Sequence, residues 1–410
     1  MQIASSTMSS SVTAAPADFS TVPHAEAVAR ARALVPALRE RAQETESGRR
    51  LLPANETDLH RTGLFRFGQP RRWGGMELDF VSMFELPMIV GEGCASTAWN
   101  VGNLAIHHWM LALFDPQAQA DVWAVSPDAL IASGIAYPQG RAERVDAGIR
   151  LSGHWNFSSG VESSQWNMLA ALVREGDRVV DYLMCLVPCS EHEVIDDWHV
   201  LGMRGTGSRS VRVSDLFVPS HRVLSMLQAR GGGDFPGAGV NPNPMYRIPM
   251  SALAAHCIGG VAVGNAQAAL DLTIAAVRER STSYTASRMR DFQAVQLRVA
   301  AAASRIEAAR LMGMQDCIDA QAIASAGRIP SDEDKLRFKR NLAFLVGLCT
   351  EAVDGLHAMA GANGIYDRYP IQRLFRDAHA LSGHISFSWD TQGANWGLVA
   401  LGGSVANPAL

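Results

Sequence analysis

Hydrophobic and polar positions change their spacing twice along the chain, and each change marks a domain boundary. In the first part, apolar residues recur with helical spacing, as in AEAVARARALVPALRERAQE, where Pro36 is expected to kink or interrupt the helix. Another helix is expected to start at Pro53 and to break near Gly63. The stretches DFVSMFELPMIVGEG and STAWNVGNLAIHHWMLALF predict buried helices. Together they predict an N-terminal helical domain over residues 23–127, after a disordered tail over residues 1–22.

Residues 128–228 show a second pattern, in which short runs are rich in β-branched and aromatic residues. The runs are LIASGIAYP, IRLSGHWNFSSG, WNMLAALVREGDRVVDYLMCLVP and SRSVRVSDLFVPSHRVL. The polar REGDR break indicates a hairpin turn. No long helices separate these strands, so the pattern favours an antiparallel barrel or sandwich over a parallel sheet.

Residues 229–410 return to helical spacing after the Gly/Pro-rich connector ARGGGDFPGAGVNPNPMYRIP. Helical stretches are expected at about 250–280, 287–327, 332–361 and 371–401. Helices of this length are typical of an antiparallel four-helix bundle. The predicted fold class is therefore α+β and mostly helical, with a helical domain, a central β domain and a bundle in that order.

Composition and charge narrow the kind of partner. The 410 residues are 48% hydrophobic and 19% charged, which suits a globular chain with a large core. A net charge of −4 and a pI near 6.3 give no basic excess, so neither nucleic acid nor an anionic membrane is an expected partner. The chain has no apolar run of spanning length free of charges and no secretory signal at its start.

Cysteine and glycine motifs exclude further classes. The six cysteines contain no CxxC pair, which indicates reduced thiols and a cytoplasmic location, and no His or Cys spacing predicts a metal site. The glycine clusters GMRGTGS and GGGDFPGAG do not open a helix directly after a strand. A built-in nicotinamide dinucleotide site is therefore not expected.

Three stretches carry a resemblance to a known family. They are IRLSGHWNFSSG, VLGMRGTGSRSVRVSDLFVPSHRVL and the C-terminal RYPIQRLFRDAHALSGHISFSWD. In this order they resemble the acyl-CoA dehydrogenase fold, whose β domain is a barrel. In one large branch of that family a Glu shortly after the R-x-x-R-D motif is the catalytic base. That place falls here on Ile385, and no Glu or Asp lies between Asp377 and Asp390.

The missing carboxylate counts against acyl-CoA oxidation. The chain instead resembles the flavin-dependent monooxygenase branch of the same fold. This branch contains the oxygenase components of two-component aromatic hydroxylases, such as the p-hydroxyphenylacetate enzymes. The resemblance implies reduced FMN or FAD supplied by a separate NAD(P)H:flavin reductase. It also implies O₂ captured as a C4a-hydroperoxyflavin, a phenolic or fused aromatic substrate, and a homo-oligomer, most simply a tetramer.

The resemblance also implies a set of residues around the flavin. Ser158 falls where the family places a hydroxyl beside flavin N5, with Ser159 as the nearest alternative and Phe157 on the same strand end. Trp99 is expected to pack against the flavin, and Arg247 to neutralise part of it. Ordinary structural roles, such as a turn serine, a core aromatic or a salt-bridged arginine, remain open for each.

A second set is expected around the substrate. His384 is one position from the lost carboxylate and is the candidate general acid or base, because an imidazole with a pKa near 6.5 can move a proton at neutral pH. His107 and Ser133 are expected to hold the phenolic hydroxyl. A core histidine and a small strand residue are the structural alternatives.

Three other functions remain open at this point. One is an acyl-CoA dehydrogenase with a displaced base. Another is an oxygenase that acts on nitrogen or sulfur. The third is a flavin-binding protein without catalysis.

Overall fold

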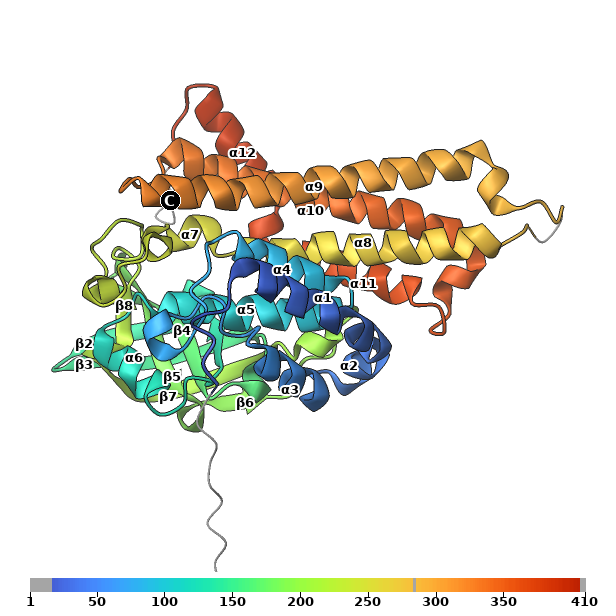
Figure 1. The fold of residues 1–410 in the computed structure, drawn as a ribbon. Coiled ribbons are helices and arrows are strands. Elements are labelled where there is room, and N and C mark those ends of the chain that lie inside the picture. The colour runs from blue at the N-terminus through green and yellow to red at the C-terminus, as the bar shows by residue number, and fades with distance from the viewer. Residues whose placement is uncertain (1–16, 283–284, 406–410) are drawn as a thin grey trace, which may run out of the picture.

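The N-terminal part of the chain is a helical domain, as expected (Figure 1). The computed structural model describes residues 17–282 and 285–405. The helices are α1 (His24–Glu40), α2 (Ala42–Gly48), α3 (Pro53–Thr62), α4 (Ser82–Gly91), α5 (Ala95–Leu111) and α6 (Pro116–Trp123). Pro53 opens α3 and Gly63, at φ 76°, ends it. Pro36 does not interrupt α1, which continues to Glu40.

The predicted tail over residues 1–22 overlaps the described residues only at 17–22, and residues 1–16 lie outside them. Phe19 and Val22 are buried in the main core, and the Phe19 N–H donates to the carbonyl of Gly74. The helical domain therefore includes residues that the sequence pattern assigned to the tail.

The central domain is an eight-stranded sheet with its own hydrophobic core. The strands are β1 (Ile131–Gly134), β2 (Gly140–Val145), β3 (Gly148–Ser158), β4 (Trp166–Glu175), β5 (Arg178–Pro188), β6 (Glu193–Ile195), β7 (Arg209–Pro219) and β8 (Val223–Ser225). They pair in the order β6-β7-β3-β2-β4-β5-β8, and β1 also pairs with β4. The predicted hairpin joins β4 to β5 through Gly176, at φ 59°.

The expectation of a purely antiparallel sheet is wrong at two pairs. Both β1 and β2 run parallel to β4. The sequence analysis also missed β2, because its GRAERV sequence carries charges on the solvent face and lacks β-branched residues before its last position. The sheet is therefore mixed, and β1 enters it directly from the helical domain.

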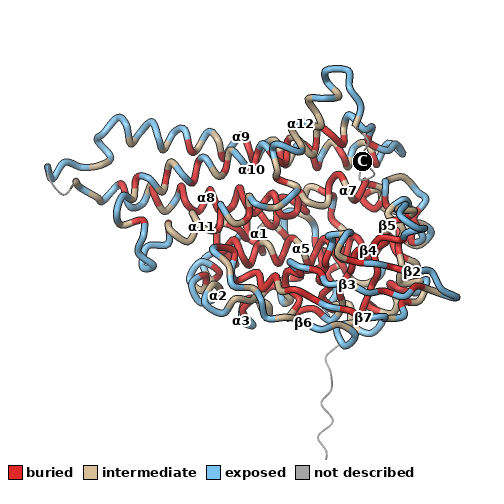
Figure 2. The backbone as a smooth tube through the Cα atoms, turned by 180° about the vertical axis from the view of Figure 1, so that it is seen from behind, coloured by how far each residue is buried: buried red, intermediate tan, exposed pale blue. Residues whose placement is uncertain are grey.

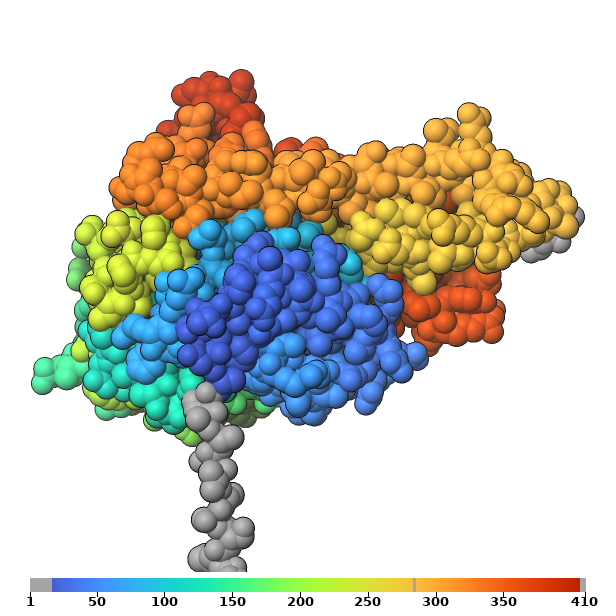
Figure 3. All heavy atoms as spheres, viewed as in Figure 1, coloured from blue at the N-terminus to red at the C-terminus, as the bar shows by residue number. Residues whose placement is uncertain are grey.

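The C-terminal part contains the predicted bundle, which lies across the other two domains (Figures 1 and 3). Its helices are α7 (Met250–Leu253), α8 (His256–Glu279), α9 (Gln293–Ser325), α10 (Asp332–Ala360), α11 (Ile371–Ser382) and α12 (Trp389–Ala400). The last predicted helix is thus two helices, separated by a break that contains His384. Figure 2 shows buried positions concentrated around α5 and the sheet, whereas the projecting end of α9 is exposed.

Two segments of the bundle are long and apolar enough to cross a membrane by length and composition. They are Met250–Glu279 and Asp332–Ile365, with 61% and 50% of their most apolar windows buried. The α8 backbone also touches α4, since Gly264 lies against Gly91. Core helices of a bundle have these properties, so we treat both segments as part of the fold.

Candidate active site

Three side chains from distant parts of the sequence meet where α5 faces the end of β3. Trp99 on α5 is half-buried, and its indole Nε1–H donates to Ser159 Oγ at 3.1 Å. The ring of His384, in the break between α11 and α12, lies edge-on to Trp99 with 5.9 Å between ring centroids. The structure thus brings together three of the residues that the sequence singled out.

A chain of hydroxyl groups continues from Ser159 into the loop before β7. Ser159 Oγ lies 2.7 Å from Ser208 Oγ, which lies 2.6 Å from Thr206 Oγ1. Thr206 Oγ1 in turn donates to the Met203 carbonyl at 2.9 Å. All three hydroxyl residues are buried, so their hydrogen bonds are protected from water. This chain fixes the position of the Trp99 indole relative to the sheet.

The far end of the chain is anchored by a buried acid. The Met203 N–H donates to Asp377 Oδ1 at 2.6 Å, and Asp377 belongs to the R-x-x-R-D motif on α11. Burial raises the pKa of Asp377 to about 6. Its neighbour Arg376 pairs with Glu46 on α2. These charged groups hold the loop before β7 against the bundle, and none of them points to a role as a base.

His384 is a neutral hydrogen-bond donor in this geometry. Its Nδ1 accepts the backbone N–H of Ser386 at 3.2 Å, so the ring proton is on Nε2. Burial lowers the pKa of His384 to about 4. The expected pKa near 6.5 is therefore too high, and near pH 7 the side chain presents an Nε2–H.

Ser158 is not on the same side of the strand as Ser159. It is 0% exposed, and its hydroxyl accepts from Asn167 Nδ2 on β4 at 3.0 Å. The strand pairing shifts register between Trp155 and Ser158, and Phe157 has a φ of 66°. This bulge turns Ser158 into the β domain and leaves Phe157 66% exposed, against the ring of Trp198. The Ser158 contact to flavin N5 stays a prediction, and the hydrogen bonds of Ser159 favour the alternative at the neighbouring position.

His107 and Ser133 form a second, deeper group. His107 lies eight residues after Trp99 on α5, about 12 Å along the helix. Its Nδ1 donates to the carbonyl of Ile131 at 2.5 Å, on the strand that carries Ser133. Burial lowers the pKa of His107 to about 4, and its Nε2 is a buried acceptor without a partner among the described residues. A substrate hydroxyl is one donor that would satisfy this nitrogen.

Arg247 belongs to a short helix whose Met245 carbonyl accepts from the Trp109 indole on α5. Its short helix, Pro244–Arg247, packs on α9, and its carbonyl accepts from the N–H of Gly232 in the connector. Nothing in the described residues brings its guanidinium to Trp99 or Ser159. A contact between Arg247 and the flavin stays a prediction.

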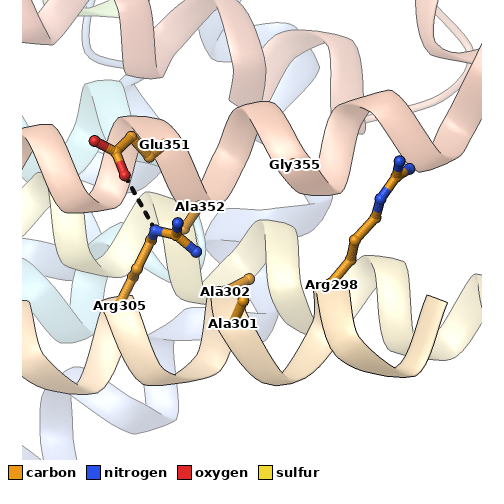
Figure 4. Close-up of a pocket in the computed structure, with 7 residues that line it drawn as sticks. All are labelled: Arg298, Ala301, Ala302, Arg305, Glu351, Ala352 and Gly355. Carbon is orange, nitrogen blue, oxygen red and sulfur yellow. Dashed lines mark hydrogen bonds and ion pairs between the residues drawn. The ribbon is translucent and has the colours of Figure 1, made fainter. Parts of the chain in front are cut away.

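Two cavities of the described residues lie on the bundle. One of 140 Å³ lies between α9 and α10, where Arg305 pairs with Glu351 and Arg298 lies farther along α9 (Figure 4). Another of 250 Å³ is lined by Met312, Arg340, Asn341, Phe344 and Trp389. No residue of the Trp99 group lines either cavity.

Comparison with known proteins decides the family. The family description "Acyl-CoA dehydrogenase, C-terminal domain" matches residues 256–389. The FADH(2)-dependent resorcinol hydroxylase oxygenase component of Rhizobium sp. (strain MTP-10005) is 36% identical over 399 residues, which cover 95% of this chain and 97% of that protein. The chain belongs to the oxygenase components of flavin-dependent hydroxylases.

Solved structures similar to this chain agree with this assignment. The HsaA monooxygenase from M. tuberculosis has a TM-score of 0.89 and 32% identity, covering 95% of this chain and 100% of that one. XiaF from Streptomyces sp., solved with FADH2 and glycerol, has a TM-score of 0.86 and 28% identity, covering 94% and 97%. The acyl-CoA dehydrogenase fold predicted from the sequence is thereby confirmed.

The residues present fit the flavin that such oxygenase components use. Trp99 supplies a flat half-buried wall, and Ser159 supplies a buried oxygen held by two neighbours, Trp99 and Ser208. Thr206 and Asn167 were not found from the sequence, because short polar residues in a loop and on a strand carry no pattern of their own. The RGTGS motif was a usable signal for Thr206, since its φ-positive Gly207 requires a tight turn there.

Proposed function

We propose that this protein is the oxygenase component of a two-component flavin-dependent monooxygenase that hydroxylates a phenolic or fused aromatic substrate. Reduced FMN or FAD would come from a separate NAD(P)H:flavin reductase by diffusion. The bound reduced flavin supplies the chemistry that activates O₂ for transfer of one oxygen atom to the ring. The observation that carries the proposal is the similarity to the resorcinol hydroxylase component over nearly the whole chain.

In this proposal the residues of the site have distinct tasks. Trp99 packs against the flavin ring, and Ser159 accepts a hydrogen bond at its N5 edge. His384 donates its Nε2–H and holds a proton near the oxygen that is transferred. His107 Nε2 accepts a hydrogen bond from the phenolic hydroxyl, beside Ser133. The aromatic surface formed with Phe157 and Trp198 would exclude water from the bound flavin.

Acyl-CoA oxidation has less support than aromatic hydroxylation. The family position of the catalytic Glu is Ile385 here, and its side chain is 69% exposed. Asp377, the nearest acid before it along the chain, is committed to the Met203 N–H. Abstraction of an α-proton needs a free carboxylate over the flavin, and the described residues around Trp99 supply none.

A homotetramer is part of the proposal. Ile385, Trp389 and Leu401 lie in and after the α11–α12 break and are 69%, 50% and 89% exposed. A cluster of large exposed apolar side chains favours burial against another subunit. Light scattering of the purified protein tests this, and a mass of one 44.1 kDa chain would contradict it.

Rapid mixing of the protein and reduced flavin with O₂ tests the function. We expect a long-lived absorbance in the near ultraviolet that differs from oxidised flavin, and oxygen consumption that depends on a phenol from a test panel. Bleaching of bound oxidised flavin by an acyl-CoA would instead support a dehydrogenase. Oxygen consumption with amines or thiophenes alone would favour oxidation of nitrogen or sulfur.

A further inference from the structure

We propose that the hydroxyl chain through Ser159, Ser208 and Thr206 makes this site selective for reduced over oxidised flavin. The inference rests on the proposed function, because it concerns the same cofactor. Its basis is the direction of the hydrogen bonds in the chain, which the geometry determines. Ser208 and Thr206 then act as positioning residues that set which hydrogen bonds Ser159 has left to make.

The direction follows from the end of the chain. A hydroxyl group has one hydrogen to donate and two lone pairs to accept with. Thr206 Oγ1 lies 2.9 Å from the Met203 carbonyl oxygen, which only accepts. If Thr206 donated to Ser208 instead, two acceptors would face each other at that distance. Thr206 therefore donates to Met203.

The remaining hydrogens then have only one arrangement that satisfies every contact. Ser208 donates to Thr206 across 2.6 Å, because the Thr206 hydrogen is already used. Ser159 donates to Ser208 across 2.7 Å for the same reason. Trp99 Nε1–H donates to Ser159 Oγ, which fills one of its two lone pairs. Ser159 Oγ is left with one free lone pair and no free hydrogen.

The position of the accepting carbonyl is fixed on both sides. The Met203 N–H is held by Asp377, and Met203 itself has a φ of 55°, in the left-handed region that non-glycine residues rarely adopt. A Cβ on Gly205 would come within 2.5 Å of Thr45 Cγ2, so the loop also packs tightly against α2. The chain therefore has a rigid acceptor at its end and is held in one direction.

This arrangement distinguishes the two redox states of flavin. Reduced flavin carries a hydrogen on N5, whereas oxidised flavin has a bare lone pair there. Ser159 is buried and is the member of the hydroxyl chain that contacts the half-buried Trp99, the residue proposed to pack against the flavin ring. It would accept from the reduced N5–H and would meet the oxidised N5 as lone pair against lone pair. One buried hydrogen bond made in only one state favours that state about tenfold.

Ser208→Ala tests the inference by freeing the Ser159 hydrogen. The variant and the wild type are titrated with oxidised flavin in air and with reduced flavin under anaerobic conditions, using FMN and FAD in turn. We expect the wild type to bind reduced flavin at least tenfold more tightly. In Ser208→Ala the ratio of the affinity for reduced flavin to that for oxidised flavin should fall about tenfold. This corresponds to a change of about 30 mV in the reduction potential of bound flavin.

Thr206→Val is the second variant, because valine keeps the shape of threonine and removes the hydroxyl that donates to the Met203 carbonyl. Its ratio should fall in the same direction. Ser82→Ala is the matched control, since Ser82 is also fully buried and donates to a carbonyl, that of Asp79, at 2.7 Å on α4. Its ratio should equal that of the wild type.

The outcomes separate the two proposals. A wild type that binds oxidised and reduced flavin equally, or a ratio unchanged in folded Ser208→Ala and Thr206→Val, overturns the inference and leaves the proposed function standing. A wild type that binds neither flavin overturns the proposed function. A lower ratio in both chain variants but not in Ser82→Ala supports the inference.

Discussion

Two buried polar networks in this protein are built from different groups. The chain at the site joins Trp99, Ser159, Ser208 and Thr206, none of which carries a charge. The network in the bundle centres on Asp316 of α9, which accepts from Arg337 and Asn341 of α10 at 3.2 and 2.9 Å. His256 of α8 lies 3.5 Å from its second oxygen.

The charged network is suited to stabilising the fold, whereas the neutral network is suited to orienting hydrogen bonds toward a ligand. A buried charge without its partners is costly, so the Asp316 network penalises any arrangement that separates the three helices. Neutral hydroxyls impose a smaller penalty, but each fixes the direction of the next hydrogen bond. A charged network is therefore suited to the bundle, and a directional one to the face where flavin would bind.

The largest expected effect is on the rate of hydroxylation, from replacing His384, which lies against Trp99 at the edge of the neutral network. His384→Ala should lower the rate of substrate hydroxylation about 100-fold or more, because it removes the positioned donor. Rapid-mixing kinetics with a phenol substrate measure this rate. His384→Gln keeps a donor of similar reach and should retain more activity than alanine. Equal rates in the wild type and His384→Ala would exclude this role.

The same residue gives a prediction on pH. Because the pKa of His384 is lowered to about 4, its ring is neutral throughout the range from pH 6 to 8. His384→Gln should therefore leave the shape of the rate profile in that range unchanged while lowering its height. Loss of an inflection near pH 6.5 would show that the histidine titrates there instead.

The next effect should fall on stability alone. Asp316→Ala removes the buried acceptor of Arg337 and Asn341, while Arg337 keeps Asp319 at 2.9 Å, so we expect a loss of about 1–3 kcal/mol for the hydrogen bonds that are left unmade. Urea unfolding measures the loss. Asp316→Asn keeps an oxygen for Asn341 and should lose less. If either variant changed the ratio of reduced to oxidised flavin binding while folded, the separation of the two networks would be wrong.

The sequence predicted the elements well where single residues determine their ends. Pro53 and Gly63 begin and end α3, and the REGDR turn joins β4 to β5. The last helix was predicted too long, because the break at His384 depends on its own ring accepting the Ser386 N–H. That contact leaves no trace in the spacing of apolar residues.

The candidate site could be predicted only in part. The sequence named Trp99, Ser159 and His384, but only the structure shows that they lie together. The choice between Ser158 and Ser159 depends on the positive φ of Phe157, and a non-glycine residue gives no signal of that in the sequence. The bulge is a property of how β3 pairs with β7, so only the three-dimensional pairing reveals it.

The two adjacent serines therefore offer a direct comparison. Ser159→Ala should shorten the lifetime of the near-ultraviolet absorbance about tenfold, because a buried hydrogen bond worth about 1–3 kcal/mol is lost. Ser158→Ala removes only an acceptor of Asn167 and should lower stability with little effect on that lifetime. The reverse pattern would return the N5 contact to Ser158.

The smallest expected effect concerns the first donor of the chain. Trp99→Phe keeps an aromatic wall but removes the N–H that Ser159 accepts, and a single such bond contributes about 0.5–1.5 kcal/mol. We expect the affinity for reduced flavin to fall a few-fold, measured by anaerobic titration. Trp109→Phe is the control on the same helix, since its indole donates to the Met245 carbonyl at 2.9 Å and not to the hydroxyl chain. It should lower the unfolding free energy by a similar amount and leave flavin affinity unchanged. Equal losses of affinity in the two variants would mean that Trp99 acts only through packing of α5. The hydrogen bond from its indole to Ser159 would then have no part in flavin binding.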